Sequence, residues 1–293
     1  YTQFDLVKKI FKQADEKLNY PLSKLILEGP ENELQLTKNT QPAILTVSYS
    51  IYKVLKDEFN FDFSSFQFFA GHSLGEYSAL VCSGSLSFSD ALFLLHERGK
   101  AMQEAVPVGM GSMIAVLGMK TEEIEKLLKL RSKDNGVCEV ANDNAEGQVI
   151  VSGNKESIDS FKLFLKEKKI KSIPLKVSAP FHCSLMKPAA DVMKEKIKSV
   201  NFKDPLFKII NNVTATPEIN SENLKELLVK QIFSTVRWRE SIIRMSESNV
   251  KNFVELGPGK VLSGMVKRTI KEANCFSINS ITDIKFLQDE FKR

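Results

Sequence analysis

The chain of 293 residues is poor in histidine, tryptophan and cysteine, with three, one and four copies of each. The four cysteines are widely spaced and form no C-x-x-C pair, so the sequence indicates neither a zinc site nor a redox pair. No segment approaches the roughly 18 consecutive apolar residues of a membrane span. The scarcity of histidine constrains any catalytic mechanism, because a histidine base must be His72, His96 or His182.

Charge is nearly balanced, with 41 basic and 36 acidic residues and a formal net charge of +5. Hydrophobic residues make up 43% and charged residues 26%, which is typical of a globular protein with a normal core. The lysines are spread along the chain without interleaved aromatic residues, so we expect neither nucleic acid nor membrane binding. A mildly basic surface suits an acidic protein partner, although solubility explains it equally well.

Apolar spacing predicts helices over residues 4–18 and 41–59, the second with Pro42 in its first turn. A short buried strand is expected over residues 66–70, followed by a glycine-flanked turn and an apolar helix that ends at Gly84. Another helix is expected from about residue 88 to residue 105. Helices alternating with short buried strands indicate an α/β fold.

The pattern changes between residues 111 and 178, where the predicted order is strand, helix, strand, strand, helix and strand. That order is typical of a ferredoxin-like unit. The large-domain pattern returns afterwards, with a helix over 188–200 and strands over 207–211 and 252–256. We therefore predict a small domain inserted into a larger one.

Gly71-His72-Ser73-Leu74-Gly75 has the G-x-S-x-G pattern of a nucleophile turn between a strand and a helix. Such a turn exposes the serine hydroxyl and leaves the N–H of the next residue, Leu74, free to bind an oxyanion. The following helix directs its positive end at the same place. A glycine-rich turn with an idle serine also fits the bare pattern, but the strand-to-helix context favours a nucleophilic Ser73.

The three histidines differ in their suitability as a base. His72 adjoins Ser73, and successive side chains diverge at such a turn, while His96 lies on a predicted helix as a partly exposed residue. His182 follows a predicted strand in a loop stiffened by Pro180, and loops after strands often carry functional residues. Elimination leaves His182 as the candidate base, with a structural histidine as the open alternative.

Arg98 falls on the apolar face of the predicted helix 88–105, three residues after Leu95 and four before Met102. A buried guanidinium needs an anionic partner, because an unpaired buried charge is very costly. A structural carboxylate and a ligand carboxylate held bidentately both satisfy that need. Two further loops, 141–145 and 255–259, either line a site or simply connect elements.

Seven segments of the chain match a known family in the order in which that family carries them. They are Gln41-Pro42-Ala43, residues 71–80, Arg98-Gly99 with Met102-Gln103, Pro180-Phe181-His182, Asn211-Asn212-Val213, Gln231 with Val236-Arg237-Trp238, and residues 255–262. On these segments the chain resembles the malonyl-CoA:acyl carrier protein transacylases of type II fatty acid synthesis. The resemblance implies an α/β-hydrolase-like large domain with a parallel central sheet, residues 1–110 and 179–293, and a ferredoxin-like small domain, residues 111–178.

The resemblance also implies roles for individual residues. Ser73 is expected to be the nucleophile, His182 its base, and the N–H of Leu74 one oxyanion donor. Gln231 is expected to orient His182 through its main-chain carbonyl, so that the site is a dyad. Transfer then follows a ping-pong course through an acylated serine.

Substrate recognition follows from the same resemblance. Arg98 is expected to bind the malonyl carboxylate, with Met102 as a second substrate-binding residue. The expected substrates are malonyl-CoA and phosphopantetheinylated acyl carrier protein, with no permanently bound cofactor and no metal. We expect a monomer that is not secreted and that resides in bacterial cytoplasm or in the stroma or matrix of a plastid, apicoplast or mitochondrion.

One feature of the family has no counterpart in this sequence. The family opens with a buried strand and a G-Q-G-S-Q loop whose glutamine helps to form the oxyanion hole, and Gln3 and Gln13 lie in the wrong context to replace it. Loss of one oxyanion donor typically lowers the rate by about 100-fold or more. We therefore expect the natural protein to carry an N-terminal extension, which the intact mass of the native protein tests.

Two other functions are compatible with parts of the sequence. A serine esterase or thioesterase would share the G-x-S-x-G turn, but it would need an acid between serine and histidine and a histidine late in the chain, and it would leave an inward Arg98 unexplained. A non-catalytic domain would share the surface that binds the carrier protein but would not form an acyl-serine. An acyl adduct on Ser73 distinguishes an enzyme from this second alternative.

Overall fold

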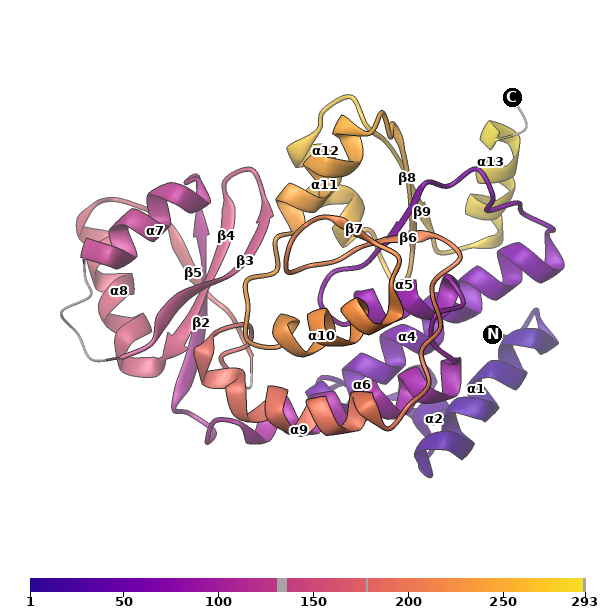
Figure 1. Cartoon of the computed structure of the whole chain (residues 1–293), viewed down its shortest axis with the longest axis horizontal. Coiled ribbons are helices and arrows are strands. Elements are labelled where there is room, and N and C mark those ends of the chain that lie inside the picture. The colour runs from indigo at the N-terminus through magenta and orange to yellow at the C-terminus, as the bar shows by residue number, and fades with distance from the viewer. Residues whose placement is uncertain (131–135, 178, 292–293) are drawn as a thin grey trace.

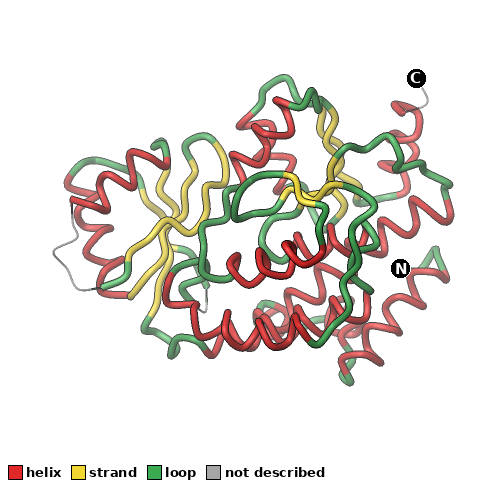
Figure 2. Tube along the Cα trace, in the orientation of Figure 1, coloured by secondary structure: helices red, strands yellow, loops and turns green. Residues whose placement is uncertain are grey.

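The computed structural model describes residues 1–130, 136–177 and 179–291. Residues 131–135 and 178, which belong to the predicted small domain, lie outside the described residues. Figure 1 shows a lobe formed by residues from 111 to 174 at one end of the molecule and a larger body formed by the remaining elements. In Figure 2 the strands of the lobe run together in one sheet, whereas the larger body is mainly helical.

The helices of the larger body are α1 (Asp5–Leu18), α2 (Leu22–Glu28), α3 (Glu31–Leu34), α4 (Thr37–Lys53), the π-helical turn η1 (Val54–Glu58), α5 (Gly75–Cys82), α6 (Phe88–Glu104), the 3-10 turn η2 (Ser184–Met186), α9 (Lys187–Lys198), α10 (Ser221–Gln231), α11 (Trp238–Glu247), α12 (Val261–Thr269) and α13 (Ile281–Phe291). Its strands are β1 (Phe68–Ala70), β6 (Lys208–Ile210), β7 (Pro217–Glu218), β8 (Asn252–Leu256) and β9 (Asn274–Ile278). The lobe consists of β2 (Gly111–Leu117), α7 (Thr121–Leu130), β3 (Cys138–Ala145), β4 (Gln148–Asn154), α8 (Lys155–Glu167) and β5 (Ser172–Pro174).

Helix α4 begins earlier than predicted, and Pro42 lies inside it rather than in its first turn. A proline within a helix removes one N–H, which leaves the carbonyl four residues earlier without its usual donor. Here that carbonyl belongs to Lys38, and it lies 3.1 Å from Nδ1 of His96 on α6. The side chain of His96 therefore takes the place of the missing backbone donor, and the helix continues through the proline.

The lobe is a four-stranded antiparallel sheet in the order β3-β4-β2-β5. Its two faces follow from the alternation of side chains along a strand. Ile114 and Val116 of β2 pack with residues of α7 and α8 on one face, whereas Met113 and Ala115 point to the opposite face. Phe181, which precedes the candidate base, packs on this second face, so the sheet forms one wall behind the loop that carries His182.

Among the described residues, the strands of the larger body do not form the single parallel sheet that the resemblance implied. Strands β1 and β6 are parallel, but β7 is antiparallel to β6, and β8 pairs in parallel with β9 in a separate sheet. The antiparallel pair arises from a tight turn after β6, in which the side chain of Asn211 bonds to Thr214 and Thr216. A short turn joins only antiparallel neighbours, since parallel strands need a longer crossover.

The lobe is joined to the larger body along the edge of β3. The N–H of Val236 donates to the carbonyl of Ala141, and the N–H of Asp143 donates to the carbonyl of Val236, both at 2.9 Å. The loop predicted over residues 141–145 is therefore the irregular end of a strand that pairs with the larger body. The carboxylate of Asp143 adds an ion pair with Arg239 at 2.9 Å. These bonds fix the lobe against the body.

The turn after β8 connects a strand with a helix. The carboxylate of Glu255 accepts hydrogen bonds from the N–H groups of Leu262 and Ser263 in the first turn of α12, at 3.0 and 2.7 Å. A carboxylate at this place satisfies free helix donors and stabilises the positive end of the helix dipole. Of the two interpretations of residues 255–259, the structural connection therefore accounts for Glu255.

Candidate active site

Ser73 lies in the turn between β1 and α5, with a backbone φ of 52°. Non-glycine residues rarely adopt this left-handed conformation, and it is strained unless the surroundings hold it. A Cβ added to Gly71 would lie 2.0 Å from the carbonyl oxygen of Gly75, so no side chain fits at position 71. The turn is thus as sharp as the motif predicted, and it presents Ser73 at the end of β1, whose residues are partly buried rather than fully buried as predicted.

The side chain of Asn212 holds this turn from both sides. Its Oδ1 accepts a hydrogen bond from the N–H of Ser73 at 2.7 Å, and its Nδ2 donates to the carbonyl of Gly71 at 2.9 Å. Asn212 lies just after β6 and is completely buried. It belongs to one of the matching segments, but its residue type and position alone predict no role for it. A polar residue directly after a buried strand was the available signal.

His182 is brought to Ser73 across 109 residues of sequence. Its Nε2 lies 2.8 Å from Oγ of Ser73, and its Nδ1 lies 2.9 Å from the main-chain carbonyl of Gln231. Because a carbonyl only accepts, Nδ1 carries the proton and Nε2 is free to accept the proton of Ser73. His182 also has a positive φ, 56°, in a loop fixed by the carboxylate of Glu139, which accepts bonds from N and Oγ of Ser184.

Arg98 points inward from α6, as its helical position predicted, and only 1% of it is exposed. Its Nη2 donates to Oγ of Ser73 at 3.0 Å and to Oε1 of Gln231 at 2.8 Å. Its Nη1 donates to Oε1 of Gln41 on α4 at 2.7 Å. The guanidinium therefore lies directly beside the hydroxyl of Ser73, the candidate nucleophile. All three of these acceptors are neutral.

Gln231, at the end of α10, connects these residues. Its main-chain carbonyl holds His182, and its side-chain oxygen accepts from Arg98. Its side-chain nitrogen donates to the carbonyl of Ser73 at 3.0 Å and to Oε2 of Glu76 at 2.8 Å. Glu76 is completely buried in α5 and also accepts from a backbone N–H at 3.0 Å. Sequence reasoning missed Glu76, although a carboxylate inside a short apolar helix was a visible signal.

Burial dominates the electrostatics of the site. It lowers the pKa of His182 to about 3, with a further lowering by the positive charge of Arg98. It raises the pKa of Glu76 to about 7, against hydrogen bonds from Gln231 and Asn212 and the charge of Arg98, which lower it. Burial also lowers the pKa of the Arg98 guanidinium. At neutral pH His182 is therefore uncharged, as a general base must be before it accepts a proton.

Two other predicted site residues occupy different surroundings. Within the described residues the N–H of Leu74 donates to no protein acceptor, so it is available beside Ser73. Met102 is buried in the main hydrophobic core, one helical turn beyond Arg98. Its contact with substrate stays a prediction.

His72 faces the lobe and not the nucleophile's hydroxyl. Its Nε2 lies 2.8 Å from Oδ1 of Asn144 on β3, and its ring packs edge-on against Trp238. The expected divergence of neighbouring side chains thus places His72 and Ser73 in different contacts. The pair of His72 and Asn144 joins the nucleophile turn to the lobe.

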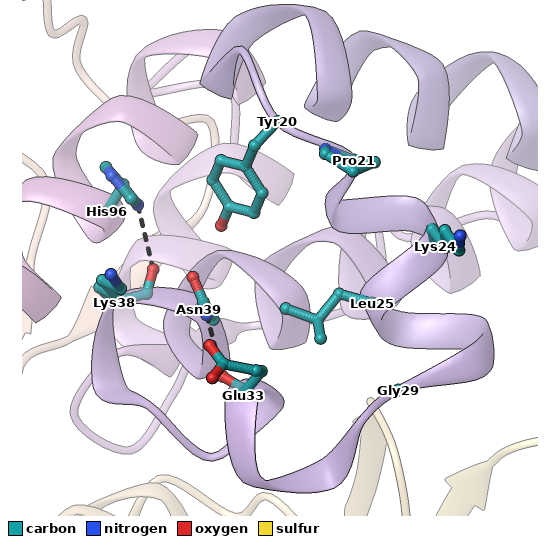
Figure 3. Close-up of a pocket in the computed structure, with 9 residues that line it drawn as sticks. All are labelled: Tyr20, Pro21, Lys24, Leu25, Gly29, Glu33, Lys38, Asn39 and His96. Carbon is teal, nitrogen blue, oxygen red and sulfur yellow. Dashed lines mark hydrogen bonds between the residues drawn. The ribbon is translucent and has the colours of Figure 1, made fainter.

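A hollow of about 350 Å³ lies elsewhere, between the N-terminal helices and α6 (Figure 3). Figure 3 shows His96 directed at the carbonyl of Lys38, with the Tyr20 ring across the hollow. None of the predicted site residues lines it. His96 thus acts here as a structural partner of α4.

The described part of the chain contains neither a cluster of metal-ligating side chains nor a membrane-spanning helix. No group of three or more histidine, cysteine, aspartate or glutamate side chains in this part is arranged to hold a metal ion. No helix in this part has the length and apolar character needed to cross a membrane.

A strained serine, a neutral histidine held by a carbonyl and a buried arginine beside the serine fit the class of serine-dependent acyltransferases with an α/β fold. Comparison with known sequences agrees with this class. A family profile described as "Acyl transferase domain" matches residues 5–288. The chain is 41% identical over 281 residues to the malonyl CoA-acyl carrier protein transacylase of Bacillus subtilis, which covers 95% of this chain and 87% of that protein. The chain belongs to the malonyl CoA-acyl carrier protein transacylase family.

Solved structures show the same fold. An acyl-carrier-protein S-malonyltransferase from Bartonella henselae superimposes with a TM-score of 0.96 at 37% identity, covering all of this chain and 93% of that one. A second structure shows a type II PKS acyl-carrier protein in complex with its malonyl-transacylase. It superimposes with a TM-score of 0.94 at 37% identity, covering 99% of this chain and 93% of that one.

Proposed function

We propose that this protein transfers a malonyl group from malonyl-CoA to the phosphopantetheine thiol of acyl carrier protein through a malonyl ester on Ser73, and so supplies fatty acid synthesis. The observation that carries the proposal is the position of Oγ of Ser73, 2.8 Å from Nε2 of His182 and 3.0 Å from Nη2 of Arg98. The first contact serves a nucleophile, and the second serves an acyl group that bears a carboxylate. The family membership of the chain supports the same substrates.

In the first half-reaction, His182 takes the proton of Ser73 while Oγ attacks the thioester carbonyl carbon. The new C–O bond forms as the carbonyl electrons move onto oxygen, and the N–H of Leu74 stabilises that charge. The C–S bond then breaks, and His182 returns its proton to the departing CoA thiolate. The carbonyl of Gln231 holds the imidazole in the required tautomer throughout.

The acyl carboxylate is proposed to bind the guanidinium of Arg98, which can hold it bidentately. The Nε of Arg98 is buried without a hydrogen-bond partner in the described part of the chain, so this N–H group can donate to a ligand. An acetyl group offers no such acceptor and leaves the buried donors without an anion, which favours the malonyl group. Met102 is proposed to support this part of the pocket from the core side of α6.

In the second half-reaction, the phosphopantetheine thiol gives its proton to His182 and its sulfur attacks the ester carbonyl of malonyl-Ser73. The bond to Oγ of Ser73 breaks, and His182 returns the proton to that oxygen. These steps use only main-chain and side-chain groups of this chain and the two substrates, so they need no further cofactor. The malonyl-transacylase structure with its acyl-carrier protein supports such a partner.

The proposal includes the domain division and the location. We assign residues 1–110 and 179–293 to an α/β-hydrolase-like domain and residues 111–178 to a ferredoxin-like domain, supported by the separate antiparallel sheet of the lobe. We place the protein in bacterial cytoplasm or in an organelle stroma or matrix. The bacterial location is supported by the relative from Bacillus subtilis and the solved structure from Bartonella henselae. The second oxyanion donor, the glutamine of the family's G-Q-G-S-Q loop, stays a prediction.

The test is to mix the purified protein with malonyl-CoA without an acceptor and to measure its intact mass. One malonyl group should be found on Ser73, absent in Ser73→Ala and retained in Ser78→Ala, a matched serine change on α5. Addition of phosphopantetheinylated carrier protein should discharge the adduct onto the carrier thiol. Steady release of CoA without the carrier would support a hydrolase instead, and the absence of both an adduct and CoA release would exclude both enzymes.

A further inference from the structure

The guanidinium of Arg98 is a buried cation with no ion-pair partner in the described part of the chain. Its hydrogen bonds end on Gln41, Gln231 and Ser73, which are all neutral. The centroid of the Tyr77 ring lies 5.9 Å from Cζ of Arg98 and provides a weak cation–π contact. A buried charge of this kind requires a compensating negative charge close by.

Glu76 is the carboxylate that the structure links to this cation. One amide separates them: Arg98 donates to Oε1 of Gln231 at 2.8 Å, and Nε2 of the same Gln231 donates to Oε2 of Glu76 at 2.8 Å. Glu76 is 0% exposed, so water does not screen its charge. The other carboxylate oxygen, Oε1, is buried and has no hydrogen-bond partner. That oxygen is a free place for a proton.

We propose that Glu76 is the internal counter-ion of Arg98, coupled to it through the amide of Gln231, and that Glu76 takes up a proton from solvent when the substrate carboxylate binds Arg98. The inference rests on the proposed role of Arg98 in malonyl recognition. It makes Glu76 a positioning residue that never touches substrate. Its charge holds the empty site together and competes with the malonyl carboxylate for the same cation.

The direction of the effect follows from linkage. A second negative charge on Arg98 disfavours ionised Glu76, so malonyl binding raises the pKa of Glu76 from its value of about 7 in the empty site. By reciprocity, ionised Glu76 weakens malonyl binding, and a rise of about one pKa unit corresponds to about tenfold in affinity. Malonyl affinity should therefore fall as the pH rises above about 7, while affinity for an uncharged acyl group should not.

The other titratable groups facing this pair do not change charge in that range. His182 has its pKa lowered to about 3, and Tyr77 on α5 has its pKa raised to about 12, in both cases mainly by burial. Gln231 of α10 and Asn212 after β6, which contact Glu76, do not titrate. Glu76 is the group facing Arg98 whose ionisation falls near neutral pH.

The experiment measures binding to a Ser73→Ala chain, which cannot form the ester. Calorimetry with malonyl-CoA in buffers of different ionisation enthalpy, from about pH 7 to about pH 9, counts protons taken up. We expect net uptake above pH 7 and a Kd that rises by about fivefold over this range for a pKa rise of about one unit. Acetyl-CoA, which carries the same nucleotide and no acyl carboxylate, should show neither effect.

Glu76→Gln in the same background should abolish the uptake and flatten the pH dependence, with malonyl-CoA binding about tenfold tighter than in the Ser73→Ala chain near pH 9. Glu97→Gln is the matched control: it removes one negative charge from the neighbour of Arg98 on α6, where Glu97 pairs with Lys196 at the surface. It should keep the parent behaviour.

Proton uptake that is absent from the Ser73→Ala chain, or that persists in Glu76→Gln, would overturn the inference. The first result needs no Glu76 variant, so poor folding of Glu76→Gln leaves the test intact. The malonyl adduct on Ser73 of the unmodified protein is measured separately. If the adduct forms and no protons are taken up, only the role of Glu76 fails; if the adduct does not form, the proposed function fails.

Discussion

Replacement of Asn212 by alanine is the sharpest test of how the nucleophile is held. The change removes the acceptor for the N–H of Ser73 and the donor to the carbonyl of Gly71. Asn212 is completely buried, so the two backbone groups lose their partners in a dry environment. The strain of a positive φ at Ser73 is then no longer opposed.

The expected magnitude follows from those two groups. A buried polar group left without a partner costs about 1–3 kcal/mol, so Asn212→Ala should lower the free energy of unfolding by about 2–6 kcal/mol. At roughly 2–4 °C per kcal/mol for a chain of about this size, even the lower end reduces Tm by about 4–8 °C. Relaxation of the turn moves Oγ of Ser73 away from His182, and a misplacement of about 1 Å costs on the order of 100-fold in rate.

The assay pairs thermal unfolding with the rate of malonyl-adduct formation at saturating malonyl-CoA. Asn211→Ala is the matched control, because this neighbouring asparagine holds the turn before β7 through Thr214 and Thr216 and does not contact Ser73. It should lower Tm as well, yet acylate Ser73 within about twofold of the unmodified rate. If both variants acylate equally fast after the same loss of stability, the proposed clamp on the nucleophile is wrong.

Three further outcomes are expected. Arg98→Ala should reduce malonyl transfer and raise acetyl transfer relative to it, because the acyl carboxylate loses its cation; competition between the two acyl-CoAs measures this, and an unchanged malonyl preference would contradict it. The acid limb of kcat/KM should lie below about pH 5, since the base is protonated only as the pH falls through the lowered pKa of His182, about 3; a limb near the ordinary value of 6.5 would refute the effect of burial. Arg239→Ala should lower the free energy of unfolding by about 3–5 kcal/mol in a denaturant titration, because Asp143 stays buried without its cation. Asp143→Asn in the same chain should recover part of that loss, and no recovery would show that the ion pair does not stabilise the contact between lobe and body.

Local sequence was sufficient for the features that depend on neighbouring residues. The G-x-S-x-G turn follows from glycine spacing, and the inward direction of Arg98 follows from its place on the apolar face of α6. The strand over Asn252–Leu256 was predicted with its observed bounds. In each case the pattern and the structure involve the same few residues.

The long-range contacts of the site could not be predicted from local sequence patterns. His182 reaches Ser73 from 109 positions away and Gln231 from 158, and no local pattern encodes which strand ends meet at one edge. Local sequence did not decide whether His182 is a catalytic base or a structural histidine. Only the family resemblance predicted its role as a base. Pro42 shows the same limit, because the donor that replaces its missing N–H comes from His96 on α6.

In the proposed function, Gln231 connects Arg98, which binds the acyl carboxylate, with His182, the base. Its carbonyl holds His182 while its side chain holds Arg98, so the two groups stay close and the positive charge of Arg98 lowers the pKa of His182. If a malonyl carboxylate binds Arg98 as proposed, it offsets that charge and raises the pKa of His182 toward the range in which an imidazole is an effective base. An acetyl group leaves the charge in place and the base weak. Discrimination should therefore be found in the rate of acylation at saturating acyl-CoA as well as in binding, which a pocket that merely excluded the acetyl group would not produce.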